Sequence, residues 1–400
     1  MIFSARAIDQ STKYRRCVFN FLHVYREGQG LPSKTTETTP KNNLLPYESP
    51  LIIFTYQRDN YLRDTLTDIL KNIPRDCSVG CPIVLSQDGN NPAVINVIHN
   101  FTKQFAEIGI PVVHLQHHNN IRGKPYIELA VHYGWGLTQV FSNRAQAPGK
   151  SISPKRVIIL EEDLHTAEDF FDYFAAMAPI LDRDFTLLAV SAFNDNGYEG
   201  KVLQPDRVLR SDFFPGLGWM LTRKLWEEEL QHKWPQGYWD DWLREPAQRQ
   251  NRHILRPEIS RTFHFGVKGG ASMNQFGSRL SNVLLDQTPV DWKHFGEDIM
   301  KSLELPRYNA NYAALVQAAH LETSIDKALQ IVKQRDTRIE YQSFKEFQRL
   351  ARALKLMDDE KAMIPRTAYK GIVETRPHGD HLLFLTPPLQ VVLEALKAAP

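Results

Sequence analysis

The chain has 400 residues, more than one hydrophobic core usually holds, so two domains are expected. It is 42% hydrophobic and 24% charged, and its formal net charge of +2 gives no polyelectrolyte signature, which argues against a nucleic acid partner. No apolar run approaches the ~20 residues of a membrane-spanning helix, and no signal peptide is evident.

The first 48 residues read as a stem, because Gly, Pro, Ser, Thr and Lys dominate 28–43 and no apolar period is sustained. From Ser49 to about residue 180, strand and helix patterns alternate. The predicted strands lie at 51–54, 82–85, 110–115 and 157–160, followed by one at 187–191, and helices are predicted between them, among them 91–105 and 126–141. This alternation predicts a mainly parallel, doubly wound α/β sheet. Cys77 and Cys81 could close a small loop or remain free thiols.

The segment from Arg156 to Phe174 holds the strongest functional signal. A short apolar strand ends in Glu161, Glu162 and Asp163, and Thr166 is predicted to cap the helix that follows. Ligands of open α/β sheets bind outside the carboxyl ends of the strands, where three acids repel one another unless a cation is present. A hard divalent cation bound to carboxylate and phosphate oxygens is one solution. For the triplet alone, a solvated acidic approach to a helix is the simpler interpretation.

Arg58 and Asp88 also follow apolar strands, so all these polar groups are expected at one edge of the sheet. An arginine beside a metal suits the phosphates of a nucleoside diphosphate, and an aspartate suits a base or ribose donor. The chain has neither G-x-G-x-x-G nor G-x-x-x-x-G-K-[ST], so a metal would have to neutralise the phosphates. By itself, Asp88 in the sequence QDGNN is more simply a turn residue.

Residues 210–262 are rich in Trp, Phe, Pro and Arg, and 238–242 read YWDDW. Aromatic rings stack on sugars, and a partly buried acid serves as a general base. Equally, the tryptophans could be core anchors and the acids could pair with Arg244 and Arg249. His132 alone is most simply a structural histidine. The glycine-rich segment 267–273 is either a lid over phosphates or an ordinary loop.

The remaining chain predicts a connector at 282–303 and a smaller α/β domain at 304–400, with helices near 313–334 and 342–356 and strands near 372–373 and 382–385. The predicted catalytic domain is 49–281, after the stem at 1–48.

Several blocks resemble one known family, the α-1,3-mannosyl-glycoprotein 2-β-N-acetylglucosaminyltransferases (N-acetylglucosaminyltransferase I). The resemblance covers roughly residues 50 to 375. Its motifs are SQD at 86–88, HYGWGLTQVF at 132–141, EEDLHTAEDFFDYF at 161–174, WDDWLREPAQRQNR at 239–252, RPEISRTFHFG at 256–266 and MDDEKAMIPRTAYKGIV at 357–373. A related family that transfers the same sugar to O-linked mannose on protein ranks second, because WDDW, RPEISRT and the C-terminal block are closer to the N-glycan enzyme.

The resemblance implies a GT-A type nucleotide-sugar fold, UDP-GlcNAc as donor, Mn²⁺ as cofactor and residence in the Golgi lumen. It implies an inverting transfer of GlcNAc to O2 of the α-1,3-linked mannose of a high-mannose N-glycan. Matching the motifs makes Asp240 the general base and Asp163 the metal ligand. The donor-binding residues carried over in the same way are Arg58, Asp88, His132, Glu161, Glu162, Trp239, Ala271 and Ser272.

The chain departs from the family pattern in several places. Glu162 stands where the family has Asp, the lid carries an extra glycine near Gly270, and the N-terminal membrane anchor is not visible. The family has cysteines at the positions of Tyr56, Gly89, Ala189 and Ile254, so both partners of each bridge would be replaced together. Two other classes remain open: a glycan-binding protein without turnover, and a metal-dependent phosphohydrolase of nucleotide sugars.

Overall fold

The computed structural model describes residues 44–118, 121, 123–145, 153–266, 268, 277–294 and 297–398. Most of the predicted stem, and the lid residues Ala271 and Ser272, therefore lie outside the described residues.

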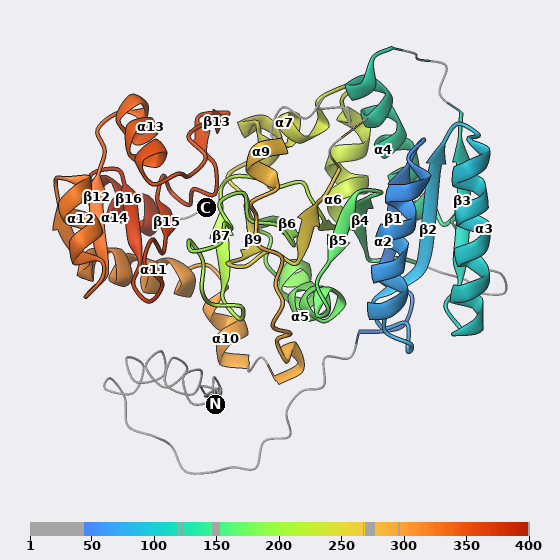
Figure 1. The fold of residues 1–400 in the computed structure, drawn as a ribbon, viewed down its shortest axis with the longest axis horizontal. Helices are drawn as coiled ribbons and strands as arrows, with labels where there is room; N and C mark the ends of the chain where they lie inside the picture. Colours follow the sequence, from blue (N-terminus) through green and yellow to red (C-terminus); the bar gives the residue numbers. More distant parts are fainter. Residues whose placement is uncertain are drawn as a thin grey trace, which may run out of the picture. The chain divides into compact units, whose positions relative to one another are not determined.

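Two sheets organise the described chain (Figure 1). The N-terminal elements are β1 (Pro50–Thr55), α2 (Asp59–Asn72), β2 (Gly80–Asp88), α3 (Pro92–Glu107), β3 (Val112–His117), α4 (Pro125–Phe141), β4 (Arg156–Glu161), β5 (Leu164–Thr166), α5 (Phe170–Arg183) and β6 (Leu187–Ser191). The middle elements are β7 (Val208–Ser211), β8 (Trp219–Thr222), α6 (Arg223–Leu225), η1 (Trp226–Leu230), η2 (Gln231–Lys233), α7 (Trp239–Arg244), α8 (Pro246–Arg249), β9 (His253–Pro257), β10 (Thr262–His264), α9 (Gly277–Leu280), η3 (Trp292–His294) and α10 (Glu297–Ser302). The C-terminal elements are α11 (Arg307–Ala318), β11 (His320–Glu322), α12 (Ile325–Ile331), β12 (Thr337–Glu340), α13 (Phe344–Ala353), β13 (Glu360–Lys361), β14 (Ile364–Pro365), β15 (Val373–Thr375), β16 (Leu383–Thr386) and α14 (Leu389–Lys397).

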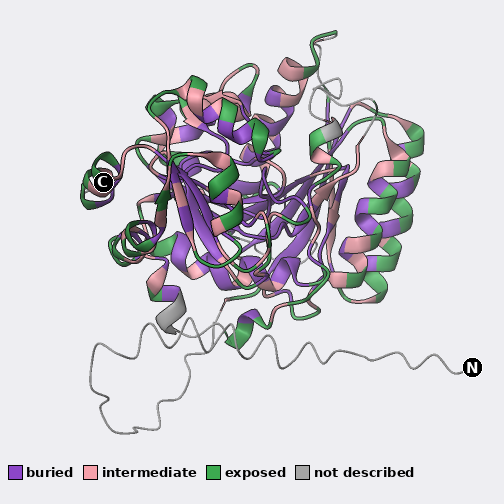
Figure 2. Ribbon diagram, turned by 60° about the vertical axis from the view of Figure 1, so that its left-hand side comes forward, coloured by how far each residue is buried: buried purple, intermediate pink, exposed green. Residues whose placement is uncertain are grey.

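The larger sheet has the strand order β3-β2-β1-β4-β8-β6-β9-β7. Its first four strands are mutually parallel, β8 is antiparallel to both of its neighbours, and β6 and β9 are parallel to each other. Successive residues of a strand face opposite sides. Accordingly, Leu51 and Ile53 of β1 pack in the core shared with α2, α3 and α5, whereas Ile52 and Phe54 pack in the core shared with α4. Figure 2 shows the buried sheet between helices whose outer faces are exposed.

The predicted α/β class and the parallel, doubly wound sheet are thus confirmed. All four predicted strands before residue 161 exist, and helices lie over 92–107 and 125–141. The predicted cap at Thr166 is wrong. Thr166 instead ends β5, which pairs with β10 (Thr166 opposite Thr262), and α5 begins only at Phe170. Strand pairing with a segment almost a hundred residues away overrode the local helix signal.

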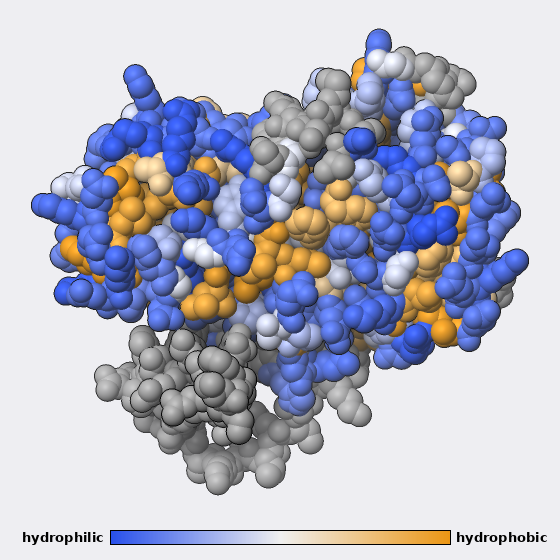
Figure 3. Space-filling view, in the orientation of Figure 1, coloured by the Kyte–Doolittle hydropathy of each residue, from blue (hydrophilic) through white to orange (hydrophobic). Residues whose placement is uncertain are grey.

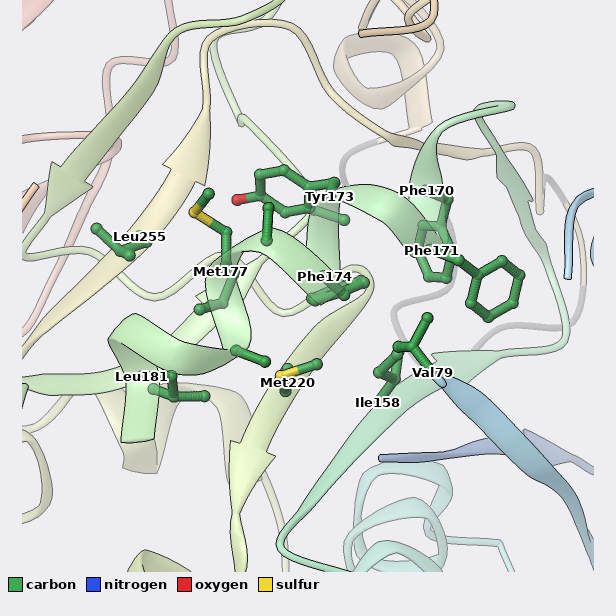
Figure 4. Packing of buried hydrophobic residues seen from close by; sticks show 14 of the residues in the cluster. Val79, Ile158, Phe170, Phe171, Tyr173, Phe174, Met177, Leu181, Met220 and Leu255 are labelled. Atoms are coloured by element: carbon green, nitrogen blue, oxygen red, sulfur yellow. The ribbon is translucent and has the colours of Figure 1, made fainter. Parts of the chain in front are cut away.

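Helix α5 supplies much of the core beneath the sheet. Its predicted inward positions are all buried: Phe170, Phe171, Phe174, Met177 and Ile180. Figure 4 shows the labelled side chains of α5 in one cluster with Ile158 of β4, Met220 of β8 and Leu255 of β9. The pattern of apolar residues at helical spacing therefore identified the buried face correctly.

The smaller sheet has the order β11-β12-β16-β15, with β15 antiparallel to β16 and the other pairs parallel. Helices α12 and α13 cover one face, and α11 and α14 pack against Phe384 on the other. The single helix predicted near 313–334 is wrong, because β11 at 320–322 divides it into α11 and α12. The chain needs that strand to complete the edge of the sheet. The domain boundary predicted at 282–303 remains a prediction.

Three pairs of neighbouring residues bear on the predictions made about cysteines. Cys77 and Cys81 form a disulfide. Tyr56 lies next to Gly89, where an added Cβ would be 3.7 Å from the tyrosine ring, and Ala189 is directly opposite Ile254 in the sheet. The four positions at which the family resemblance implies cysteines therefore form two adjacent pairs.

The surface in Figure 3 is mostly hydrophilic, with hydrophobic colour confined to separate patches. Within the described ranges, no helix combines the length and the apolar character needed to cross a membrane.

Candidate functional site

The carboxyl ends of β1, β2 and β4 lie side by side at one edge of the large sheet. Phe54 of β1 is opposite Glu161 of β4, and Thr55 of β1 is opposite Gln87 of β2. The polar residues that follow these strands therefore meet at this edge, which we call the carboxyl edge. This is where ligands bind in open α/β sheets.

Arg58 contacts two of the three acids that follow β4. Its Nε donates to Oε1 of Glu162 at 2.6 Å, and its Nη1 lies 2.8 Å from Oδ2 of Asp163. Burial disfavours the charged guanidinium, but the charges of Asp163 and Glu162 outweigh burial and raise the pKa of Arg58. The acidic edge thus contains a fixed cation of the kind that binds phosphate oxygens.

Glu162 is buried and points into the protein. It accepts hydrogen bonds from the hydroxyl of Thr55, from the backbone N–H of Tyr56 at 2.9 Å and from Arg58. Burial nevertheless outweighs these donors and raises the pKa of Glu162. Because protein donors engage both of its oxygens, Glu162 fixes the orientation of Arg58.

Glu161 connects the carboxyl edge to helix α4. The hydroxyl of Tyr133 donates to its Oε1 at 2.9 Å. Burial and the neighbouring charge of Asp163 raise the pKa of Glu161 to about 7, against the effect of this hydrogen bond. The ring of Tyr133 is stacked between Phe54, at 4.0 Å between centroids, and Trp239 of α7, at 4.5 Å. The tyrosine thus links the acids to the helix that carries the WDDW motif.

Asp163 has one satisfied and one unsatisfied oxygen. Its Oδ2 faces Arg58 and lies 3.4 Å from Nε2 of His264, whereas its buried Oδ1 has no hydrogen-bond partner in the part of the chain that the structure describes. Burial raises the pKa of Asp163, but His264 and Arg58 outweigh it, so the net shift is downward and the carboxylate is ionised. Leaving a buried carboxylate oxygen unpaired is costly, and a bound cation would remove that cost.

The donor set at Asp163 fits a hard divalent cation. Within the described ranges, no group of three or more His, Cys, Asp or Glu side chains is arranged to hold a metal. The protein therefore offers one carboxylate with His264 beside it, and the remaining ligands would be water and substrate phosphates, as such cations accept. Gly266 leaves room for this carboxylate, because a Cβ there would lie 2.2 Å from Oδ2.

A second cluster surrounds Asp88 at the end of β2. Nδ1 of His117 lies 2.9 Å from Oδ1 of Asp88, and the His117 ring stacks on His132 at 5.3 Å between centroids. His132 is buried, with its Nε2 2.8 Å from the hydroxyl oxygen of Ser86. Burial lowers the pKa of His132 to about 3, so the imidazole is neutral at pH 7.

Helix α7 presents two acids on its first turn. Asp240 and Asp241 lie 2.8 and 2.7 Å from Nη1 of Arg244, and the side chain of Asp240 is 33% exposed. Lys361 of β13 lies 2.8 Å from Asp241, and β13 is drawn next to α7 in Figure 1. Burial raises the pKa of Asp241, but Lys361 and Arg244 outweigh it and lower the pKa.

The two interpretations of the WDDW segment are therefore both partly realised. Trp239 is a core anchor, stacked on Trp219 and Trp234 as well as on Tyr133. The acids do pair with Arg244, but Arg249 lies near Asp212 instead. Among the described residues, no donor reaches the other oxygen of Asp240, so it keeps an accepting atom at the surface.

Comparison with known proteins decides the family. A family model described as the GNT-I family matches residues 25–397. The chain belongs to the GNT-I family. An α-1,3-mannosyl-glycoprotein 2-β-N-acetylglucosaminyltransferase from Arabidopsis thaliana is 37% identical over 350 residues, which cover 86% of this chain and 74% of the plant protein.

Solved structures with a similar fold are more distant from this GNT-I member. The mannosyltransferase PcManGT from Pyrobaculum calidifontis, in complex with GDP-Man and Mn²⁺, is 14% identical over 81% of this chain and 88% of its own, with a TM-score of 0.37. Residues 1–349 of S. aureus TarS, in complex with UDP, are 13% identical over 54% of this chain and 59% of that chain, with a TM-score of 0.37. At these scores, the likeness carries no inference about ligands.

At the carboxyl edge, one cluster contains Arg58, Glu161, Glu162 and Asp163. Tyr133 links this cluster to Trp239 of the WDDW motif, because it hydrogen-bonds to Glu161 and stacks on Trp239. Asp88 and His132 form the neighbouring cluster, and Asp240 lies one residue beyond Trp239. Sequence reasoning did not identify Tyr133, His117, His264 and Gly266 as site residues. His117 could have been found from its position at the end of β3 and Tyr133 from its position on α4, and His264 and Gly266 both stand in the RPEISRTFHFG motif.

Proposed function

We propose that this GNT-I family member transfers GlcNAc from UDP-GlcNAc to O2 of the α-1,3-linked mannose of a high-mannose N-glycan, forming a β-1,2 linkage with inversion and depending on Mn²⁺. The geometric observation that carries the proposal is the separation of two kinds of carboxylate. Asp163 is buried and ionised, with one oxygen that has no partner among the described residues, and Asp240 is half-buried on another element, with 33% of its side chain exposed. The stack of Tyr133 on Trp239 connects the two.

On the donor side, Asp163 is the metal ligand and Arg58 binds phosphate oxygens. A bound Mn²⁺ supplies positive charge to the departing diphosphate, so no protein acid is needed there. Glu161 lines the donor sugar, whereas the buried Glu162, which the family resemblance also places at the donor, acts by holding Arg58 in place. Asp88 and the neutral His132 belong to the nucleotide side, where their partners His117 and Ser86 fix their orientation.

On the acceptor side, Asp240 is the general base. An inverting displacement needs a base on the face opposite the leaving group. Asp240 takes the proton from the 2-hydroxyl of mannose, that oxygen bonds to C1 of GlcNAc, and the bond from C1 to UDP breaks with its electron pair. Trp239 forms the floor beside the sugar, since it is held by aromatic neighbours on several sides.

Two further assignments follow from the family. Ala271 and Ser272, which lie outside the described residues, are assigned to donor binding by the family resemblance alone. The acceptor is an N-glycan on a glycoprotein in the Golgi lumen.

The test is transfer from UDP-GlcNAc to a Man5GlcNAc2 glycan with Mn²⁺, followed by mass spectrometry. We expect the glycan to gain one GlcNAc, and Asp240→Asn to slow transfer by about 10²–10⁴-fold because proton removal is lost. Asp241→Asn is the matched control, because Asp241 is the adjacent acid and is equally close to Arg244. It should retain most of the rate.

An equal loss in both variants would refute Asp240 as the base. Transfer to an O-mannosyl peptide in place of the N-glycan would refute the acceptor. Binding of UDP-GlcNAc without transfer to either acceptor would refute the proposed transferase activity. Release of UDP in the absence of an acceptor would indicate a phosphohydrolase.

A further inference from the structure

Two tyrosines from separate segments stack on each other beside α7. The rings of Tyr126, at the start of α4, and Tyr238, just before α7, are 4.4 Å apart between centroids with planes inclined by 21°. The segment 119–120 is not described, but both tyrosines are. Among the described residues, no hydrogen-bond partner is found for either phenol hydroxyl. The pair therefore offers aromatic surface and two polar groups together.

Tyr238 is held in an unusual state for a large aromatic residue. Its ring is exposed, with 57% of the residue accessible, although most aromatic residues of the described chain are buried. Its backbone is left-handed, with φ 47° and ψ 45°, which costs a non-glycine residue free energy of the order of 1 kcal/mol. The ring remains exposed although it stacks on Tyr126, so a ligand that uses the ring is the simplest reason for its exposure.

The position of the pair fits the acceptor rather than the donor. Tyr238 is two residues before Asp240, the proposed base. Tyr126 and Tyr133 are seven residues apart on α4, so they lie on one face of the helix, about 10 Å apart along its axis. Tyr133 contacts Glu161 on the donor side, and Tyr126 therefore lies about two turns away from that contact.

The electrostatic surroundings agree with this placement. Burial raises the pKa of Tyr126, and the negative charges of Asp240 and Asp241 raise it further, with a smaller effect from Glu161. Tyr126 thus remains a neutral phenol close to the acids of α7. A neutral hydroxyl beside a sugar can both donate and accept hydrogen bonds.

We propose that the stacked pair of Tyr126 and Tyr238 is an acceptor subsite, which binds the sugar ring linked to the reacting mannose. This rests on the proposed function, because the reacting mannose must lie at Asp240. The C–H face of the ring stacks on Tyr238, and the ring hydroxyls meet the phenol groups. The subsite selects a glycan over a lone mannose without contact to the donor.

The experiment measures initial rates of GlcNAc transfer to Man5GlcNAc2 and to methyl α-mannoside, for wild type and Tyr238→Ala. We expect the KM for the glycan to rise about tenfold, with the KM for UDP-GlcNAc unchanged. The preference for the glycan over methyl α-mannoside should fall by the same factor. Tyr238→Phe keeps the aromatic face and should retain most of the preference for the glycan.

Two variants complete the test. Tyr126→Ala combined with Tyr238→Ala should be no worse than either alone, because the stack acts as a unit. Phe185→Ala, which removes another exposed aromatic ring, 73% accessible and on the turn before β6, should behave as wild type. If Tyr238→Ala does not fold, Tyr238→Gly also removes the ring, and glycine suits a left-handed backbone.

An unchanged glycan KM in folded Tyr238→Ala or Tyr238→Gly would overturn the subsite, and so would a rise in the KM for UDP-GlcNAc alone. Calorimetric titration of the protein with Man5GlcNAc2 separates failure of the subsite from failure of the proposed function, because glycan binding needs no turnover. If wild type binds the glycan without transferring GlcNAc, the function fails. The subsite then stands only if Tyr238→Ala weakens that binding.

Discussion

Gly266 is the position at which one added methyl group most directly tests the role assigned to Asp163. In Gly266→Ala, the new Cβ would lie 2.2 Å from Oδ2, 2.8 Å from Cγ and 2.9 Å from Cβ of Asp163. Cβ atoms essentially never approach other heavy atoms closer than 3.0 Å, so Oδ2 must retreat by about 0.8 Å. The backbone at Gly266 is not left-handed, so the substitution acts through this contact.

Such a shift should reduce kcat about 10²-fold, because a displacement of about 1 Å in a positioned catalytic group has an effect of that size. It also disturbs the ion pair between this carboxylate and Nη1 of Arg58, now at 2.8 Å. The assay is initial-rate GlcNAc transfer over a range of Mn²⁺ concentrations, with thermal unfolding measured in parallel. We expect the Mn²⁺ concentration for half-maximal rate to rise as well.

Gly109→Ala is the matched control. Gly109 has a φ of +77° and no heavy atom within 4 Å of an added Cβ, so the substitution strains the backbone without a clash. It should cost about 1 kcal/mol of stability while leaving transfer unchanged. The reasoning is refuted if Gly266→Ala transfers GlcNAc at the wild-type rate with the wild-type metal dependence. It is also refuted if both glycine variants lose activity in proportion to stability.

Two further predictions concern the fold. Phe170 is fully buried against its neighbours in Figure 4, so Phe170→Ala should lower the free energy of unfolding by on the order of 3–5 kcal/mol in urea titration; a change below ~1 kcal/mol would contradict the packing. Burial, helped by the positive charges of Lys370, Arg210 and Arg249, lowers the pKa of His253 to about 2 in the folded chain, against 6.5 for the free side chain. Between these values the unfolded state binds the extra proton, so His253 makes stability fall as the pH drops below 6.5. His253→Gln should flatten the slope of unfolding free energy against pH by up to about 1.4 kcal/mol per unit between pH 4 and 6, and an unchanged slope would show that His253 is not buried as a neutral group.

The sequence by itself determined the alternation of strands and helices from β1 to β4 and the edge of the sheet at which the candidate site lies. Short β-branched runs such as Val157–Leu160 have few alternatives to a buried strand, and helices between them force parallel pairing. Parallel pairing then brings Arg58, Asp88 and the acids after β4 to one edge, whatever the details of packing. The long motifs identified the family for the same reason, since they are continuous in the chain.

The tertiary structure alone decided how each of these groups is used. Glu162 turns inward because Thr55 and Arg58 lie on the neighbouring strand end, which no local pattern encodes. His264 and Gly266 reach Asp163 only because β10 pairs with β5. That pairing also converted Thr166 from the predicted helix cap into a strand residue.

The same limit applies to the aromatic groups around α7. The sequence contains Tyr126 and Tyr238 but does not indicate that they stack. Their stacking depends on how α4 packs against the segment before α7. Local sequence fixes backbone preference and hydrophobic period, which act over a few residues. Contacts between side chains a hundred residues apart depend on how the elements pack. At this site those contacts determine that Asp163 is buried, that Asp240 is half-buried and that Tyr238 is exposed.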